Sequence, residues 1–515
     1  MVSALLLLLC ALLLILLLHR CFSSRGRKEE LLGKLPSQPS RLPIIGHLHL
    51  VGRHPPHVSL RDLAAKHGRD GLLLLRLGAV PTLVVSSPGA AQAVLRTQDH
   101  VFASRAYSPV TDILFYGSTD VAFSPYNEHW RQVKKIATTH LLTNRKVRSY
   151  RRAREHEVSS VLAKIRDAAG ADAAVDVSEM LHAFVNDVVC HAVSGKFFRE
   201  QGRNKMFREL IEANSSLIGG FNLEDHFPAL VKLGLVKKMV CAKAHKLHKA
   251  WDDLLENLIH DHNTSKPAAL SDDSDFIDVL LSVQHEYNLT RDHIKAQLVI
   301  MFEAGTDTSF IVLEYAMAEL MRNPHVMTKL QADLRIRANS TKDDKDMLLP
   351  LLTEDDVLAS GGMPYLKAVI KETLRLHAPA PLLVPHLSMA DCDIQGYTIP
   401  AGTRAIVNDW ALARDPTYWE KPEEFMPERF IMHARAAAMD YKGNDSLYLP
   451  FGTGRRICPG INFAIATIEV MLANLLCHFD WKLPSGVTGI DMTESFGLTV
   501  HRTEKLLLLP LLPQD

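Results

Sequence analysis

The chain has 515 residues, 47% of them apolar, and its 58 basic and 58 acidic side chains give a formal charge of zero. A chain of this length can bury a large core, and the charge balance argues against a nucleic-acid partner. The seven cysteines are odd in number and widely spaced, which indicates a reducing compartment and no disulfide framework.

Residues Val2–Leu18 form a nearly unbroken apolar run without a charge. This length is about the minimum that crosses the hydrocarbon core of a membrane as a helix. Basic residues come after the run and none precedes it, unlike a cleaved signal peptide, and the positive-inside tendency places the rest of the chain in the cytosol. We predict a membrane anchor over residues 1–20, a basic linker with a proline-rich hinge over 21–45, and one globular domain over 46–515.

Short β-rich segments come first in the globular part, and helical segments come after them. Leu72–Leu77 and Pro81–Ser86 flank Gly78-Ala79 and predict a hairpin. From Asn127 onward, Ala-, Leu- and charge-rich segments are broken by Pro and Gly, with no repeat period. The predicted fold is mostly α with small β-sheets.

Trp130 and Lys134 are four residues apart and share one helix face. An indole N–H donor beside a cation can hold a carboxylate. On these two residues alone, an exposed amphipathic helix is the better explanation of the pattern.

A long helix is predicted from about Arg291 to Arg322, with Ala304-Gly305-Thr306-Asp307-Thr308 near its middle. Gly305 removes side-chain bulk, and the Thr308 hydroxyl can bond a carbonyl one turn back, which opens a local groove. Asp307 and Thr308 together provide an acid and a hydroxyl for proton delivery. The alternative is a packing glycine with a solvated aspartate.

Glu372 and Arg375 lie three residues apart on one predicted helix face and can form an ion pair. Exposed pairs of this kind contribute only about 0–1 kcal/mol, so the spacing alone says little.

The loop Phe451-Gly452-Thr453-Gly454-Arg455-Arg456-Ile457-Cys458-Pro459-Gly460 surrounds a single cysteine with glycines. One thiolate without a second cysteine nearby cannot begin a zinc or iron–sulfur site, but it suffices as the axial ligand of haem iron. Glycines suit a tight turn that lets backbone N–H groups reach the sulfur. The alternative for a lone cysteine is a buried structural thiol.

At every fixed position this loop resembles the haem-binding signature of the cytochrome P450 family, F-x-x-G-x-R-x-C-x-G. Three more segments resemble family motifs: A-G-x-D/E-T at residues 304–308, E-x-x-R at 372–375 and P-E-R-F at 427–430. The resemblance covers nearly the whole chain in the expected order. It implies the cytochrome P450 fold with an N-terminal transmembrane helix, so residues 46–515 would form a haem-thiolate monooxygenase domain.

The resemblance also implies roles for individual residues. Cys458 would ligate the iron of haem b, and the residues that hold the haem would be Phe451, Gly454, Arg456, Gly460, Trp130 and Lys134. Asp307 and Thr308 would deliver protons. A buried triad for folding and haem retention would consist of Glu372, Arg375 and Arg429. Two positions depart from the family pattern: Lys134 replaces an arginine, and His386 stands where many relatives have a propionate-binding arginine.

The implied activity is an NADPH- and O2-dependent monooxygenase at the endoplasmic reticulum membrane. Its electrons would come from NADPH–cytochrome P450 reductase, with cytochrome b5 as a second candidate partner. Segments 124–142 and 376–416 resemble the plant microsomal group of specialised metabolism, in particular grass enzymes that oxidise indole and indolin-2-one. The expected substrate is small and hydrophobic, either an indole-derived benzoxazinoid precursor or a terpenoid used in plant defence.

Other functions remain open on the sequence. They are a flavonoid oxidase, a reductase-independent haem-thiolate isomerase or dehydratase, and a non-catalytic membrane protein that binds haem or a ligand. The acid–alcohol pair argues against the last two. Loops over 104–123 and 210–227 are expected to form the pocket. Glu303 and Ala304 are candidate substrate contacts, although Glu303 can instead turn aside and pair with a neighbouring helix.

Overall fold

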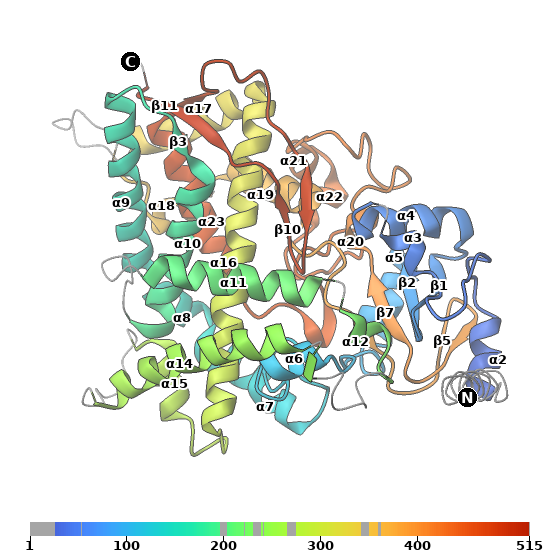
Figure 1. Cartoon of the computed structure of the whole chain (residues 1–515). Coiled ribbons are helices and arrows are strands. Elements are labelled where there is room, and N and C mark those ends of the chain that lie inside the picture. Colours follow the sequence, from blue (N-terminus) through green and yellow to red (C-terminus); the bar gives the residue numbers. More distant parts are fainter. Residues whose placement is uncertain are drawn as a thin grey trace, which may run out of the picture.

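The computed structural model describes residues 26–52, 54–195, 203–220, 222–229, 238–239, 241–264, 274–340, 350–358 and 362–513. The predicted anchor over residues 1–20 lies outside this part of the chain. Figure 1 shows a large helical region beside a smaller region that contains most of the strands of one sheet. The predicted fold class, mostly α with small sheets, is confirmed.

The predicted hairpin consists of β1 (Leu72–Leu77) and β2 (Val80–Val85), which pair antiparallel. Gly78 in the turn has φ +64°, a conformation that favours glycine. β7 (Arg404–Val407) adds to β2 in parallel, and β4 (His386–Leu387) pairs with β7. The sheet therefore joins residues more than 300 positions apart in the chain.

The described part of the predicted linker is packed against this sheet. It contains α2 (Arg27–Gly33), whose Leu32 is buried. Glu29 forms an ion pair with Arg76 of β1, and the N–H of Leu74 donates to the carbonyl of Pro36 at 2.7 Å. These contacts fix the direction in which the chain leaves the sheet.

α16 (Arg291–Arg322) is the central helix and has the predicted bounds. A capping box between Thr290 and His293 begins it. It packs against α10 (Val177–Ser194), α19 (Pro364–Leu376) and α23 (Ile461–His478). Both α16 and α23 are long and apolar enough to span a membrane, but 78% and 72% of their most apolar windows are buried in the protein, as in core helices.

The other described helices surround this core or connect it to the sheet. They are α3 (Leu48–Val51), α4 (Pro56–His67), α5 (Pro88–Gln92), η1 (Ala93–Thr97), α6 (Pro109–Leu114), α7 (Glu128–Ile136), η2 (Ala137–Leu141), α8 (Asn144–Ser149), α9 (Arg151–Gly170), α11 (Arg203–Gly219), α12 (Leu223–His226), α14 (Ala242–Thr264), α15 (Phe276–Ser282), α17 (Pro324–Ser340), α18 (Glu354–Leu358), α20 (Asp409–Leu412), α21 (Arg429–Met432), α22 (Ala434–Ala438) and η5 (Gly454–Arg456).

Three smaller sheets complete the fold. β3 (Val175–Asp176), β11 (Leu507–Leu511) and β8 (Asp480–Lys482) form one, and β5 (Cys392–Ile394) with β6 (Tyr397–Ile399) forms another. β9 (Glu494–Phe496) and β10 (Val500–Arg502) form a hairpin that reaches α16. This hairpin brings residues 494–502 to the middle of the central helix, where His501 meets Asp307 (Figure 1).

Candidate active site

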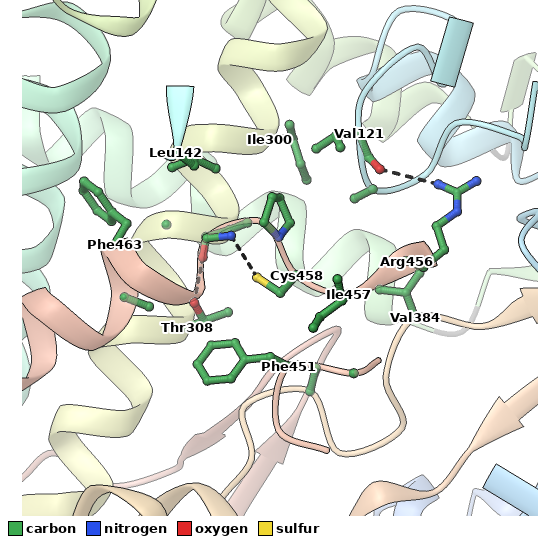
Figure 2. Close-up of a pocket in the computed structure, with 18 of the residues that line it drawn as sticks. Val121, Leu142, Ile300, Thr308, Val384, Phe451, Arg456, Ile457, Cys458 and Phe463 are labelled. Carbon is green, nitrogen blue, oxygen red and sulfur yellow. Dashed lines mark hydrogen bonds between the residues drawn. The ribbon is translucent and has the colours of Figure 1, made fainter. Parts of the chain in front are cut away.

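A cavity of about 270 Å³ lies between the middle of α16 and the loop that precedes α23. Figure 2 shows Cys458 and Thr308 directed toward it from these two elements. Its wall is mainly apolar. Ile300, Met301 and Ala304 come from α16, Val121 and Ala122 from the segment before α7, and Leu383 and Val384 from the segment before β4. Of the two regions expected to form the pocket, 104–123 contributes to the wall. No described residue of 210–227 does so, which corrects that part of the prediction.

The Cys458 loop is held by its own backbone. The N–H of Gly460 donates to Cys458 Sγ at 3.3 Å, and the N–H of Cys458 donates to the carbonyl of Phe451 at 3.0 Å. Burial raises the pKa of the Cys458 thiol, while the Gly460 N–H and the charge of Lys134 act in the opposite direction. The sulfur is therefore positioned by the turn, and nearby positive charge favours its thiolate form.

Gly454 is required where this loop meets η1. Its φ is +71°, and a Cβ at this position would lie 2.0 Å from the carbonyl oxygen of Leu95. Next to it, Arg455 donates from its backbone N–H and from Nε to the carboxylate of Asp99, both at 3.1 Å. These contacts fix the loop against η1 and the residues directly after it.

Lys134, Arg456 and Trp130 all line the Cys458 end of the cavity. Lys134 Nζ donates to the carbonyl of Ile457 at 2.6 Å, and Trp130 Nε1 donates to that of Val121 at 3.0 Å. The Arg456 guanidinium lies 4.1 Å from the centre of the Trp130 ring and donates to the carbonyls of three loop residues, Ala103, Val121 and Ser124. Burial lowers the pKa of Lys134 to about 8 and that of Arg456 to about 10.

Sequence reasoning missed Arg105, a third cation at this end of the cavity and a buried one. Its guanidinium donates to the carbonyls of Val384 at 2.6 Å, Pro385 at 3.0 Å and Ala122 at 3.0 Å, and burial lowers its pKa. His386 also lines the cavity, with Nδ1 2.7 Å from the carbonyl of Phe102. No local pattern around residue 105 distinguishes a buried loop arginine from an exposed one, so its partners had to come from the fold.

The charges around the cavity can be tested for a fit to haem. Within the described residues, Lys134, Arg105 and Arg456 bond backbone carbonyls and form no ion pair with a carboxylate. Asp120 is close enough to affect both arginines, but it accepts from two backbone N–H groups, and burial raises its pKa to about 6. Buried cations without a partner are costly, and the two propionates of haem would balance them. A single thiol, apolar walls and three cations beside one carboxylate therefore fit this cofactor.

On the opposite wall, Ala304, Gly305 and Thr308 of α16 line the cavity. The Thr308 hydroxyl donates to the carbonyl of Ala304 at 2.7 Å, the local bond expected from the sequence (Figure 2). Gly305 packs on Val189 of α10, where a Cβ would meet a methyl at 3.1 Å. The helix can therefore approach α10 closely and leave the Thr308 hydroxyl at the cavity wall.

Asp307 is buried and points away from the lining residues. Its Oδ2 accepts from the Thr499 hydroxyl and from Ser215 Oγ at 3.5 Å, and it lies 3.4 Å from His501 Nε2. Burial opposes ionisation, but His501 and Thr499 hold the pKa of Asp307 below its ordinary value. Asp307 is thus a charged group supported by β10 and α11, and neither partner was expected from the sequence.

Glu303 is buried against α11 and does not line the cavity. Asn214 Nδ2 donates to its Oε2 at 3.3 Å, and its Oε1 has no partner among the described residues. Burial raises the pKa of Glu303 to about 8. Of the two interpretations left open by the sequence, the geometry corresponds to the one in which Glu303 pairs with a neighbouring helix.

Glu372, Arg375 and Arg429 meet behind the cavity and are all buried. Arg375 donates to both oxygens of Glu372, at 2.8 and 2.9 Å, and Arg429 Nε donates to Glu372 Oε1 at 2.9 Å. The remaining guanidinium donors bond the carbonyls of Ala413, Glu420, Lys421, Pro422 and Glu424. Every charge in this cluster has a partner, as a structural ion triad requires.

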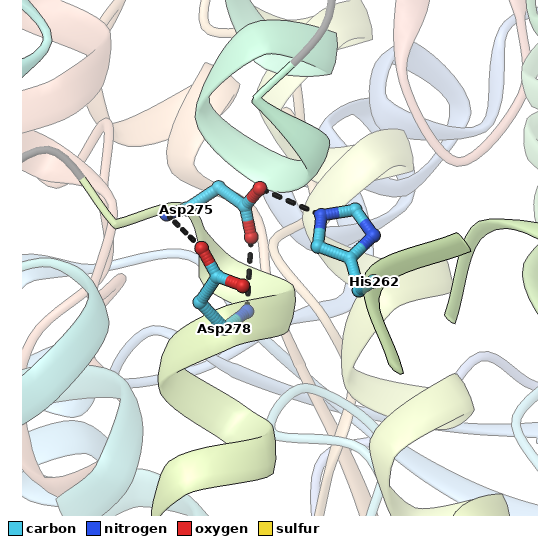
Figure 3. A group of neighbouring side chains, drawn as sticks. All are labelled: His262, Asp275 and Asp278. Atoms are coloured by element: carbon cyan, nitrogen blue, oxygen red, sulfur yellow. Dashed lines mark hydrogen bonds and ion pairs between the residues drawn. The ribbon is translucent and has the colours of Figure 1, made fainter. Parts of the chain in front are cut away.

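A second group of possible metal ligands, His262, Asp275 and Asp278, lies at the start of α15, with ligand atoms within 4.8 Å of one another (Figure 3). Asp275 and Asp278 form the capping box of that helix, with N–H to carboxylate distances of 2.9 and 3.3 Å. His262 Nε2 lies 2.8 Å from Asp275 Oδ2. These bonds use the carboxylates, so the group is explained as a helix cap with an ion pair.

Comparisons with known proteins agree with this geometry. The cytochrome P450 family profile matches residues 36–509. The indolin-2-one monooxygenase of Zea mays is 55% identical over 95% of this chain and 91% of its own length. The indole-2-monooxygenase of Zea mays is also 55% identical, over 94% of this chain and 88% of its own. A zebrafish cytochrome P450 structure with progesterone has a TM-score of 0.74 and 25% identity, covering 89% of this chain and 99% of its own.

The chain belongs to the cytochrome P450 family. It is a monooxygenase whose cofactor is haem with a cysteine thiolate ligand, supplied with electrons by a redox partner, and it acts on a small substrate.

Proposed function

We propose that the chain hydroxylates a small indole-derived ring compound of plant specialised metabolism, in the chemical class of indole and indolin-2-one. The 55% identity to two maize monooxygenases named for these compounds, over more than nine-tenths of the chain, carries this proposal. The apolar cavity wall supports it, since a small aromatic bicycle has few polar groups to satisfy.

In this proposal Cys458 is the thiolate ligand, on the turn formed by Phe451, Gly454 and Gly460. Lys134, Arg456 and Trp130, joined by Arg105, would hold the propionates, and the excess of cations over carboxylates supports that role. Bound haem supplies the binding and activation of oxygen. Asp307 and Thr308 supply protons. The Thr308 hydroxyl lies at the cavity wall, and Asp307, which precedes it in the sequence, is buried behind that wall.

Ala304 is the proposed substrate contact on α16, because it lines the wall beside Thr308. Glu303 adjoins it but faces Asn214. Any effect of Glu303 on the position of oxidation would therefore act through the orientation of α16. A Glu303→Gln variant with unchanged products and affinity would exclude this indirect effect.

The proposed electron donor is NADPH–cytochrome P450 reductase, with cytochrome b5 as an additional donor. The proposed location is the endoplasmic reticulum membrane, where residues 1–20 would anchor a cytosolic domain. The uncharged apolar run with basic residues after it supports this arrangement. Removing residues 1–20 should ease extraction from membranes without loss of haem.

The deciding experiment incubates microsomes containing this chain with indole, indolin-2-one, terpenoids and flavonoids, with product detection by mass spectrometry. Hydroxylated indole or indolin-2-one that requires both NADPH and the reductase is expected. Conversion of terpenoids or flavonoids alone would overturn the substrate class. Turnover without reductase would instead indicate an isomerase or dehydratase. Thr308→Ala should bind substrate normally but release more hydrogen peroxide per NADPH, and an unchanged ratio would exclude Thr308 from proton delivery.

A further inference from the structure

His501 and Asp307 form an ion pair between the surface and the buried middle of α16. Their Nε2 and Oδ2 atoms are 3.4 Å apart, and the Thr499 hydroxyl contacts both groups, 3.2 Å from His501 Nε2. The His501 side chain is 26% exposed, whereas that of Asp307 is 3% exposed. The pair therefore links solvent to the residue beside Thr308.

The geometry of this pair is fixed by α11 and by the turn of the β9–β10 hairpin. The N–H of Leu498 donates to the carbonyl of Ser215 at 3.3 Å, and a Cβ on Gly219 would lie 1.7 Å from Leu498 N. The hydroxyl oxygens of Ser215 and Thr499 are 2.9 Å apart. Because a side chain at position 219 would block this approach, the glycine lets the hairpin reach Asp307.

We propose that His501 is the proton-relay residue for Asp307, exchanging protons with solvent and passing them from Nε2 to Asp307 Oδ2 directly or through the Thr499 hydroxyl. This inference rests on the proposed role of Asp307 in proton delivery. In the step, the Nε2–H bond of the imidazolium breaks and an O–H bond forms on the carboxylate. The neutral imidazole then takes a proton from solvent, and no electrons are transferred.

The charges of the pair explain why a relay is needed. Asp307 is held ionised, so it does not itself store a proton near neutral pH. Burial acts against a charge on His501, but Asp307 raises the pKa of His501 above its ordinary value of 6.5. The proton of the pair therefore resides on the imidazole, the member that reaches solvent.

The surrounding charged groups leave His501 as the group that can supply this proton. Glu314 of α16 and Glu212 of α11 also favour the imidazolium, and Arg502 Nη1 lies 3.7 Å from Glu314. His182 of α10 also faces Asp307, but burial lowers its pKa to about 4, so it is neutral near neutral pH. Arg208 of α11 pairs with Glu179.

The test uses the full-length holoenzyme in microsomes with reductase and indolin-2-one, measuring NADPH consumed, peroxide released and product formed from about pH 6 to about pH 8.5. Wild type is expected to lose product per NADPH as pH rises through the pKa of His501. His501→Gln should lower this ratio about tenfold near pH 6.5, below the ~100-fold of a direct proton donor, and should remove the pH dependence. It should also raise the solvent deuterium isotope effect on turnover.

Two further variants separate relay from structure. His501→Lys keeps a cation beside Asp307 but titrates far above neutral pH. Product formed per NADPH should therefore be low and independent of pH. The matched control His182→Gln should keep the wild-type ratio and pH profile. A His501→Gln or His501→Lys variant with the wild-type profile and a normal reduced carbon-monoxide spectrum would overturn the relay.

A readout without turnover addresses the pair itself. Thermal midpoints of wild type, His501→Gln, Asp307→Asn and the double variant should show coupling that is present near pH 6 and lost as pH rises through the pKa of His501. Zero coupling at every pH would also overturn the proposal. If Asp307→Asn leaves product per NADPH unchanged, the proposed role of Asp307 fails. If the Asp307 variant lowers product per NADPH but the His501 variants leave it unchanged, only the relay is wrong.

Discussion

The two walls of the cavity balance their charges in different ways. At the Cys458 end, Lys134, Arg105 and Arg456 bond only backbone carbonyls among the described residues, so an external anion could balance their charge. On the α16 side, two acids that lie behind the wall, Glu303 and Asp307, contact Asn214 of α11 and His501 of β10. Carbonyls cannot titrate, whereas histidine and carboxylate groups can. The first wall therefore suits permanent retention of a charged cofactor, and the second suits the movement of protons.

The largest effect is expected from replacing Cys458, whose sulfur lies in the first wall. Cys458→Ser replaces a soft anionic donor with a neutral alcohol, so the thiolate signature should disappear completely. The measurement is the far-red-shifted Soret band of the reduced carbon-monoxide complex. Cys392→Ser is the matched control, because Cys392 is a half-buried thiol in β5 that does not line the cavity. Survival of the band in Cys458→Ser would show that another residue is the ligand.

The next effect concerns the triad behind that wall, whose charges are balanced internally. Glu372→Gln keeps the shape but leaves two buried guanidiniums without their acid, at a cost of about 3–5 kcal/mol in the free energy of unfolding. Urea denaturation and haem content measure the loss. Glu423→Gln is the control, because its ion pair with Arg414 involves a side chain that is 66% exposed. Equal stability of the two variants would contradict a structural role for Glu372.

The same comparison shows what could be predicted from the sequence. The Cys458 loop is one contiguous segment, and its fixed residues all lie on the turn that holds the sulfur. The central helix was predicted with its bounds because a long apolar segment begins at a cap and ends before Asn323 and Pro324. Short-range patterns therefore defined one element of each wall.

The partners of those elements could not be predicted because they come from distant parts of the chain. Arg105 bonds carbonyls about 280 positions away, and His501 reaches Asp307 across almost 200 positions. Helix periodicity placed Glu303 and Asp307 on neighbouring positions of one face, but the rotation of α16 decides which neighbour each acid meets. That rotation depends on packing against α10, where Gly305 meets Val189.

The charges behind the α16 wall can be tested at Glu303. Burial raises the pKa of Glu303 to about 8 in the folded state, whereas the ordinary value is about 4.5. The unfolded chain therefore loses this proton first, and the stability of the fold falls as pH rises from about 4.5 to about 8. Glu303→Gln keeps a partner for Asn214 without this charge. Above pH 8 the variant should be more stable by about 1–3 kcal/mol, the usual cost of an unsatisfied buried polar group.

Chemical denaturation at several pH values measures this gain. Glu209→Gln on the exposed face of α11 provides the control, since its carboxylate is 63% exposed and only 3.9 Å from Lys205. A constant difference between wild type and Glu303→Gln across this pH range would show that the pKa of Glu303 is the same in the folded and the unfolded state.

The smallest effect is expected at the His262–Asp275 pair at the start of α15, neither member of which lines the cavity (Figure 3). Burial acts against the charge, but Asp275 raises the pKa of His262 above its ordinary value of 6.5. The pair therefore contributes stability that is fully present below about pH 6.5 and disappears as pH rises through the pKa of the folded state. His262→Asn should cost about 0.5–1 kcal/mol near pH 6 and close to nothing near pH 8.5.

Thermal midpoints measured against pH test this prediction, with His100→Asn as an exposed control that should show no such trend. A divalent cation at this site would give the reverse result. Added metal would stabilise wild type most at high pH, where the imidazole is neutral and free to coordinate. Because both carboxylates already accept from the backbone of the α15 cap, only the loss of stability with rising pH is expected. This pair then serves as a reference for the His501–Asp307 pair, which has the same chemistry but lies beside Thr308.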